Sequence, residues 1–346
     1  MIGAVIGDIV GSRFEYDNCK NKNFELFAKE CFPTDDTIMT VAVGKAILES
    51  EGEYQNLGAR AIRCMQELGR PYPRCGYGSR FYDWIYSEKP EPYESYGNGA
   101  AMRICAVGFA ARNAQEVRQM SKTVTEISHN HPEGLRGAEA VAMAILLARQ
   151  CKSKEEIRSE ILKNYYSIDF RLAQIRDSYE YHVDCQGSVP QALEAFFESV
   201  GFEDAIRNAI SIGGDSDTIA AITGSVAEAY YGIPVPLREK AEKYLNNSKY
   251  APIFFWLKKF EKMFPRHKKK YLKSEPDKSQ APFLGLEGEK LFAEIFRGEI
   301  GLLFEKVGKR GGVVKIQRVG DVRDCHVGGK QIPRLIGFLF ENIFLQ

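Results

Sequence analysis

Two acidic segments, each directly before an apolar run, hold the residues of this sequence best suited to chemistry. Asp215 and Asp217 precede the run IAAI, and a Thr-Asp-Asp-Thr segment at 34–37 precedes the run IMTVAVGKAIL. A single Asp or Thr is enough to cap a helix, because one side-chain oxygen accepts one free backbone N–H. Capping therefore explains either segment taken alone, but it leaves the second acid of each pair unexplained.

Bound cations would explain the additional acids. Four carboxylates gathered in a partly dry site would repel one another by several kcal/mol, and a cation removes that repulsion. Carboxylate and hydroxyl oxygens are the ligands that Mg²⁺, Mn²⁺ and Ca²⁺ prefer. Zinc is disfavoured, since the sequence has no CxxC and no Cys/His pair at zinc spacing. Two acidic segments therefore predict two metals that share ligands.

Five motifs lie in order between about residues 1 and 260: GAVIGDIVGSRFE, PTDDT, YGNGAAMR, SHNHPEG and GGDSDTIAAITGSVAEAYYGIP. Together they resemble the ADP-ribosylglycohydrolase family. The resemblance implies an all-α fold, a compact orthogonal helical bundle, around a binuclear Mg²⁺ site in which Mn²⁺ can substitute. The metal ligands that it implies are Thr34, Asp35, Asp36, Asp215, Asp217 and Thr218.

Further candidate residues lie in the loops of these motifs. Glu15, in SRFEY, matches an acidic residue close to the metals of that family. The glycines around Asn98 let backbone N–H groups approach a diphosphate, and a plain turn into a helix is the alternative. His131 precedes a proline expected to start a helix, and it could bond to substrate or within its loop. A Cβ in the Gly-Gly pair before Asp215 would leave no room for a ribose and a metal. The expected substrate-binding residues are Gly97, Asn98, Gly99, His131, Gly213, Gly214 and Ser216.

The resemblance also implies a reaction. The substrate is an α-linked ADP-ribosyl group on a protein or another acceptor, and the product is ADP-ribose. Its anomeric bond breaks through an oxocarbenium-like state, and two cations can orient the ribose and activate water. We expect Asp35 and Asp36 to bind metal and transfer protons, with Glu15 as a mobile acid; the sequence does not divide these roles. A non-catalytic ADP-ribose-binding relative and a two-metal nucleotide phosphoesterase are the alternatives.

Composition restricts the class of protein. The chain has 346 residues, of which 44% are hydrophobic and 27% charged, as in globular proteins. A net charge of +1 does not favour nucleic acid or anionic lipid. No apolar run is long enough to cross a membrane, and the N-terminus lacks the basic region of a secretory signal. We therefore expect a cytoplasmic protein with reduced cysteines.

Long runs rich in small apolar residues predict helices at 37–48, 135–149 and 218–231, because such runs are unfavourable for strands. We expect helix starts or stops at the prolines 132, 190, 234 and 236.

The character of the sequence changes after residue 257. Residues 258–278 hold nine Lys/Arg against three acids, which is typical of a solvated linker. We predict a catalytic domain at 1–265, a basic linker at 266–281 and a small α+β appendage at 282–346. The apolar end of the appendage, PRLIGFLFENIFLQ, is a candidate for self-association or partner recognition, or it packs back onto the catalytic domain.

Overall fold

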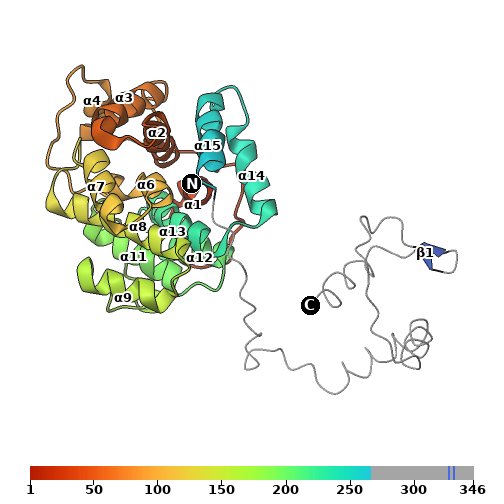
Figure 1. Cartoon of the computed structure of the whole chain (residues 1–346). Helices are drawn as coiled ribbons and strands as arrows, with labels where there is room; N and C mark the ends of the chain where they lie inside the picture. Colours follow the sequence, from red (N-terminus) through yellow and green to blue (C-terminus); the bar gives the residue numbers. More distant parts are fainter. Residues whose placement is uncertain (266–325, 328–329, 332–346) are drawn as a thin grey trace, which may run out of the picture. The chain divides into compact units, whose positions relative to one another are not determined.

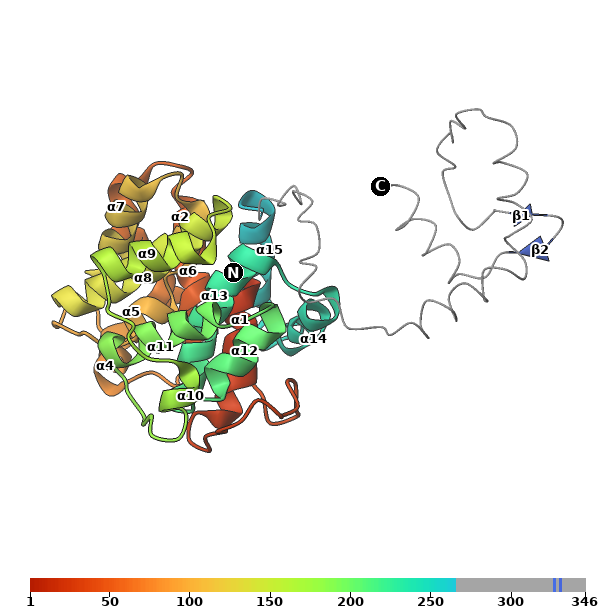
Figure 2. The same ribbon diagram turned by 90° about the horizontal axis from the view of Figure 1, so that it is seen from below.

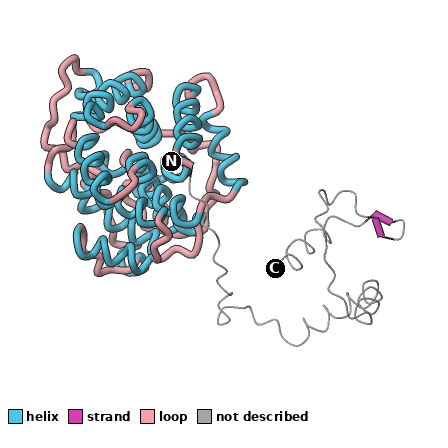
Figure 3. The backbone as a smooth tube through the Cα atoms, viewed as in Figure 1, coloured by secondary structure: helices cyan, strands magenta, loops and turns pink. Residues whose placement is uncertain are grey.

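The computed structural model describes residues 1–265, 326–327 and 330–331. Residues 1–265 form helices joined by loops and turns (Figure 3), which confirms the predicted all-α class. Beyond them, β1 (His326–Val327) and β2 (Lys330–Gln331) pair antiparallel. The rest of the predicted appendage lies outside the described residues.

The α-helices of residues 1–265 are α1 (Ile2–Gly11), α2 (Asp35–Glu49), α3 (Leu57–Gly69), α4 (Ser79–Tyr86), α5 (Gly99–Met102), α6 (Cys105–Ala110), α7 (Ala114–Thr125), α8 (Pro132–Arg149), α9 (Lys154–Asn164), α10 (Leu172–Ile175), α11 (Cys185–Phe197), α12 (Phe202–Ile210), α13 (Ser216–Tyr231), α14 (Val235–Leu245) and α15 (Ala251–Met263). Two short 3₁₀ helices are η1 (Ser12–Phe14) and η2 (Tyr54–Asn56). The three helices predicted from apolar runs are confirmed as parts of α2, α8 and α13. Each begins two or three residues earlier than its run, because the first turn is polar and falls outside the apolar pattern.

Helix α13 is the centre of this unit, with α1, α8, α11 and α12 packed around it (Figures 1 and 2). All ten residues of α1 are buried, and so is α13 from Ser216 to Ala229. A helix surrounded on every side can be apolar all round, which explains the small and apolar sequences of both. The site of interest lies where these two helices meet.

Glycines let α1 and α13 touch backbone to backbone. Gly3, Gly7 and Gly11 are spaced by four and share one face of α1. A Cβ added to Gly7 would lie 2.6 Å from the amide nitrogen of Ala221, and one added to Gly11 would lie 2.6 Å from the carbonyl of Ser216. The helices run antiparallel, so the end of α1 lies beside the beginning of α13.

The prediction for Pro190 is wrong. This proline is the sixth residue of α11 and is buried. It removes one backbone hydrogen bond, at a typical cost of about 3 kcal/mol in a helix interior. Asp184 caps the helix by accepting from the N–H of Gly187 at 2.7 Å, and α11 packs on α13, so other contacts offset the loss. The prolines at 132, 234 and 236 do lie at helix starts, as expected.

By its contacts the chain divides into two units, Met1–Lys270 and Tyr271–Gln346. The predicted boundaries of the linker and the appendage stay predictions. In the described part of the chain, none of the helices combines the length and apolarity that a membrane span requires. The cysteines of residues 1–265 are all free thiols.

Candidate active site

The first acid pair lies at the beginning of α13. Asp215 is the N-cap residue, but its side chain makes no capping hydrogen bond within the described residues. Its Oδ2 instead accepts from Asn98 Nδ2 at 2.7 Å. Asp217 lies in the first turn and is buried, and its Oδ1 accepts from the N–H of Thr218 at 3.0 Å. Helix capping is therefore not the main task of this pair.

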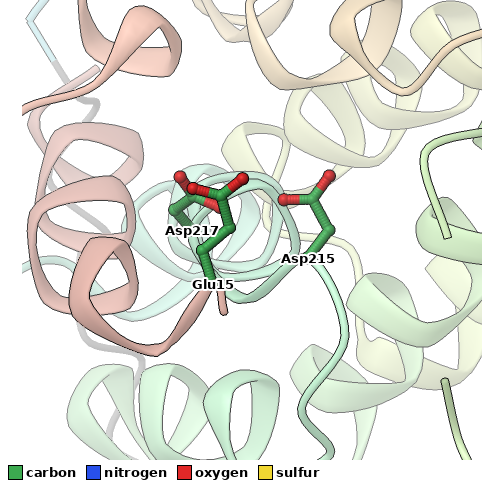
Figure 4. A group of neighbouring side chains, drawn as sticks. All are labelled: Glu15, Asp215 and Asp217. Carbon is green, nitrogen blue, oxygen red and sulfur yellow. The ribbon is translucent and has the colours of Figure 1, made fainter. Parts of the chain in front are cut away.

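Glu15 lies close to this pair and comes from the segment that follows α1. It follows η1 at the end of α1, which the antiparallel packing brings beside the start of α13. Glu15, Asp215 and Asp217 each offer an oxygen, and these oxygens lie within 4.8 Å of one another (Figure 4). Glu15 is only partly buried, and its Oε1 accepts from the hydroxyl of Tyr181 at 3.0 Å. Carboxylates at this spacing suit a divalent cation.

The second acid pair lies at the beginning of α2 and reaches the same place. Thr34 is the N-cap, and its Oγ1 accepts from the N–H of Asp36 at 3.2 Å, as capping predicts. Asp36 Oδ2 accepts from Thr218 Oγ1 at 3.3 Å, which joins the two helix starts directly. The backbone of Asp35 is fixed, since its N–H donates to the carbonyl of Cys75 at 2.9 Å.

Asp8, a residue that the sequence analysis did not select, underlies this arrangement. It is fully buried in α1. Its carboxylate accepts from the N–H of Thr34 at 3.0 Å, from Thr34 Oγ1 at 2.6 Å and from the N–H of Thr37 at 3.0 Å. The Thr37 hydroxyl donates to it as well. The sequence did contain a signal for Asp8, because it is the one acid in an otherwise apolar helix. Burying such an acid is costly unless it is hydrogen-bonded.

Burial and mutual repulsion disfavour the charged forms of these acids. Burial raises the pKa of Asp8 to about 6, although hydrogen bonds from Thr34 and Thr37 oppose the shift. Burial and then the charge of Asp8 raise the pKa values of Asp35 and Asp36 well above their ordinary range.

The pKa values of the acids at the beginning of α13 and of Glu15 are also raised. The pKa of Asp217 is raised well above its usual value by burial and then by Asp215. Burial also raises the pKa values of Asp215 and Glu15. A nearby cation would favour the charged forms of these acids, because an opposite charge lowers the pKa of a carboxyl group.

The donor set fits Mg²⁺ or Mn²⁺. Asp36 Oδ1 is buried and has no hydrogen-bond partner among the described residues, so it is a free ligand atom. Thr34 Oγ1 donates to Asp8 and accepts once, which leaves one lone pair. Every candidate ligand is an oxygen, as hard divalent cations prefer. The residues able to hold metal are Thr34, Asp35, Asp36, Asp215, Asp217, Thr218 and Glu15.

The loop before α5 lies against these acids. The side-chain amide of Asn98 donates to Asp215, and its backbone N–H donates to the carbonyl of Val183 at 2.8 Å. His129 packs beneath Gly97 and Gly99: a Cβ on Gly99 would lie 3.3 Å from its Nε2. Burial and then Arg103 hold the pKa of His129 well below its ordinary value, so this imidazole is neutral. His129, which the sequence analysis did not select, is thus a close neighbour of these glycines.

His131 makes contacts within its own loop. Its Nδ1 accepts from the N–H of Glu133 at 3.1 Å and so caps α8, and its ring packs edge-on against Tyr96, with 5.2 Å between the ring centroids. This contact matches the second of the two roles left open for His131, and a bond to substrate stays a prediction.

Glycine is required at positions 213 and 214 for a different reason than the one expected. Both have φ above +70°, a conformation that disfavours a side chain. A Cβ on Gly213 would lie 2.8 Å from Asn18 Oδ1, so protein atoms already occupy the space. Ser216 is buried, and its hydroxyl donates to the carbonyl of Phe14 at 3.2 Å. These contacts tie the start of α13 to the segment around Glu15.

Several known proteins are similar to this chain in sequence. The family model described as ADP-ribosylglycohydrolase matches residues 1–256. The chain is 25% identical to ADP-ribosylhydrolase ARH3 of Xenopus tropicalis, over 70% of this chain and 90% of that protein. It is 24% identical to ADP-ribosylhydrolase ARH3 of Homo sapiens, over 70% of this chain and 88% of that protein. It is also 24% identical to ADP-ribosylarginine hydrolase Tri1 of Pseudomonas putida, over 70% of this chain and 72% of that protein.

A solved structure titled "ADP-ribosylglycohydrolase-related protein complex" has a similar fold. Its TM-score is 0.52 at 22% identity, over 74% of this chain and 95% of that chain. Since the family model matches well over half of its residues, this chain belongs to the ADP-ribosylglycohydrolase family. The predicted family and enzyme class, a hydrolase that acts on ADP-ribosyl groups, are thereby confirmed.

Proposed function

We propose that the protein uses two Mg²⁺ ions, or Mn²⁺ in their place, to remove ADP-ribose from a modified acceptor. The bond hydrolysed joins the acceptor to the anomeric carbon of the distal ribose in an α-linked ADP-ribosyl group. The observation that carries this proposal is the meeting of both acidic helix starts, joined by the bond between Thr218 and Asp36. The free Oδ1 of Asp36 supports the metal requirement.

The buried acids are suited to binding metal. Asp36, Asp215 and Asp217 are nearly inaccessible to solvent and lie on rigid helix starts, so they hold a fixed geometry. Thr34 and Thr218 add hydroxyl oxygens from the same two turns. Bound divalent ions supply charge that orients the ribose hydroxyls and lowers the pKa of a nearby water.

Glu15 is suited to proton transfer. It is more accessible than the buried acids, and it lies on a loop at the edge of the cluster. Burial raises its pKa, which favours the protonated form that a general acid needs. The hydroxyl of Tyr181 holds its carboxyl group in place. We assign to Glu15 the protonation of the leaving acceptor atom.

The loop at 97–99 would hold the remainder of ADP-ribose. Glycines allow close approach of a diphosphate to the backbone, with the neutral His129 behind the loop. Tyr96 is half exposed beside this loop and offers an aromatic face. One relative is named an ADP-ribosylarginine hydrolase, whereas the name of another states no acceptor, so the comparisons do not identify the acceptor for this chain.

Metal removal tests the proposal. Protein treated with EDTA should release no ADP-ribose from a panel of arginine- and serine-linked peptides, and Mg²⁺ or Mn²⁺ should restore release. Asp36→Asn should lose at least about 100-fold in rate, since a ligand charge is removed. Asp83→Asn, at an exposed position on α4, is the matched control and should be unaffected.

The same assay separates the alternatives. Full hydrolysis by metal-free protein would contradict the two-metal proposal. ADP-ribose binding in calorimetry without turnover on any linkage would identify a non-catalytic relative. Release of phosphate or AMP from nucleotides in place of ADP-ribose would identify a phosphoesterase.

A further inference from the structure

Asn18 makes an unusual set of hydrogen bonds for an exposed side chain. Its Nδ2 donates to the carbonyl of Phe14 at 2.7 Å, of Glu15 at 3.1 Å and of Gly214 at 3.0 Å. Its Oδ1 accepts from the N–H of Gly214 at 2.8 Å. One amide thus bonds the backbone of Glu15 and both polar backbone groups of Gly214, the residue that precedes Asp215.

Lys20 makes a second connection between the same two segments. Its Nζ donates to the carbonyl of Ile212 at 2.6 Å and to that of Tyr179 at 2.7 Å. The 15–20 segment is therefore fixed at two points to the turn that begins α13. Gly213 makes room for this arrangement, since a Cβ at this position would lie 2.8 Å from Asn18 and 2.9 Å from Lys20.

The position of Glu15 needs such a connection. Glu15 is on a loop outside any α-helix, and its carboxylate lies within 4.8 Å of oxygens of Asp215 and Asp217. A loop can yield by swinging outward, unlike the helix start that it faces, so this short distance is kept only if the loop backbone is fixed. The hydroxyl of Tyr181 holds the side chain of Glu15, but the backbone of this residue is held by Asn18.

We propose that Asn18 is a positioning residue that fixes Glu15 at its working distance from Asp215 and Asp217 by bonding the backbone of both segments. This role rests on the proposed function, in which Glu15 transfers the proton. Asn18 does not touch the reacting atoms. It acts through Glu15, so its removal should matter only while Glu15 is able to act.

A double-mutant cycle tests this dependence. Asn18→Ala should lower kcat by about 10- to 100-fold, the effect of misplacing a catalytic group by about 1 Å, with little change in KM. In the Glu15→Gln background the same substitution should cost less than about twofold, because coupled residues are not additive. Asn18 is exposed, so its replacement leaves no buried cavity. Lys22→Ala is the matched control: Lys22 is nearby in the chain but pairs with Asp204.

Hydrogen exchange gives a readout that does not depend on catalysis. Asn18→Ala should speed amide exchange in residues 15–20 and 212–216, whereas Lys22→Ala should leave residues 212–216 unchanged. Equal losses of kcat in both backgrounds would overturn the proposal, since Asn18 would then act without Glu15. Unchanged kcat or unchanged exchange in Asn18→Ala would overturn it as well.

The two proposals can fail separately. If the wild-type protein released no ADP-ribose with either metal, the proposed function would be wrong. Exchange would still decide whether Asn18 fixes the two segments: faster exchange in Asn18→Ala would support that connection, and unchanged exchange would overturn it.

Discussion

Replacing Gly7 by alanine tests the packing that brings the acids together. The added Cβ would lie 2.6 Å from the amide nitrogen of Ala221 and nearer still to the carbonyl of Ala220. Ordinary contact begins at 3.4 Å and the nearest atom, the carbonyl oxygen of Ala220, would lie at 2.0 Å, so the two backbones must separate by about 1.4 Å. These neighbours are backbone atoms, and no side chain can rotate away to relieve the contact.

The cost can be estimated from this separation. Overpacking a well-packed core costs typically about 1–3 kcal/mol, and rigid neighbours place Gly7→Ala at the upper end. For a domain of this size about 3 kcal/mol corresponds to a fall in Tm of about 6–12 °C. Because α1 carries Asp8 and α13 carries Asp217, a shift near 1 Å should also lower the hydrolysis rate by about 100-fold.

Thermal unfolding followed by circular dichroism, together with initial rates, measures both effects. Gly58→Ala is the control, since its added Cβ would lie 3.4 Å from the nearest described atom. In a helix this change should stabilise by up to about 1 kcal/mol. A Gly7→Ala protein that melts within about 1 °C of the wild type would refute the close contact of α1 and α13.

Three further predictions concern the site and the tail. Asp217→Asn should abolish most activity yet raise Tm in EDTA by at least about 2 °C, because burial and Asp215 raise the pKa of Asp217 and so penalise its charge; an unchanged Tm in EDTA would contradict this. Gly76→Ala should weaken Mn²⁺ binding measured by calorimetry, since φ is +120° and the Cβ would lie 2.5 Å from Asp35 Oδ1; normal affinity would count against Asp35 as a ligand. A chain ending near Lys273 should fold and hydrolyse a small substrate at nearly the full rate, and an unfolded product by circular dichroism would disprove the domain boundary.

The sequence indicated the acid pairs because helix starts are local signals. A cap residue, its neighbouring acids and the apolar run that follows are all within a few positions, so 34–37 and 215–218 could be recognised together. Like-charge repulsion then suggested that the two segments share a cation. The structure brings them together through Thr218 and Asp36, a contact between residues 182 positions apart that no local pattern contains.

The contacts that support these acids could not be predicted from the sequence, because they also join residues far apart in the chain. The sequence placed Asn98 in a loop whose backbone could approach a diphosphate, but it gave no sign that its side-chain amide bonds Asp215, a contact that depends on how α5 packs near α13. The glycines before Asp215 are sterically required, but by protein atoms: those that crowd Gly213 belong to Asn18 and Lys20, and those that crowd Gly214 belong to Tyr179 and Glu180. Partners almost 200 residues away in the chain are set by the packing of helices, which the sequence alone does not give.

Asp8 accounts for why the acids of α2 are free to bind a cation. A helix start needs acceptors for its first N–H groups. At α2 the carboxylate of Asp8 accepts from the N–H groups of Thr34 and Thr37, and Thr34 Oγ1 accepts from that of Asp36. Capping is thus done by a buried acid of another helix and by a threonine. The carboxylates of Asp35 and Asp36 are left without a capping task, and the second acid that one helix start did not need is available for metal.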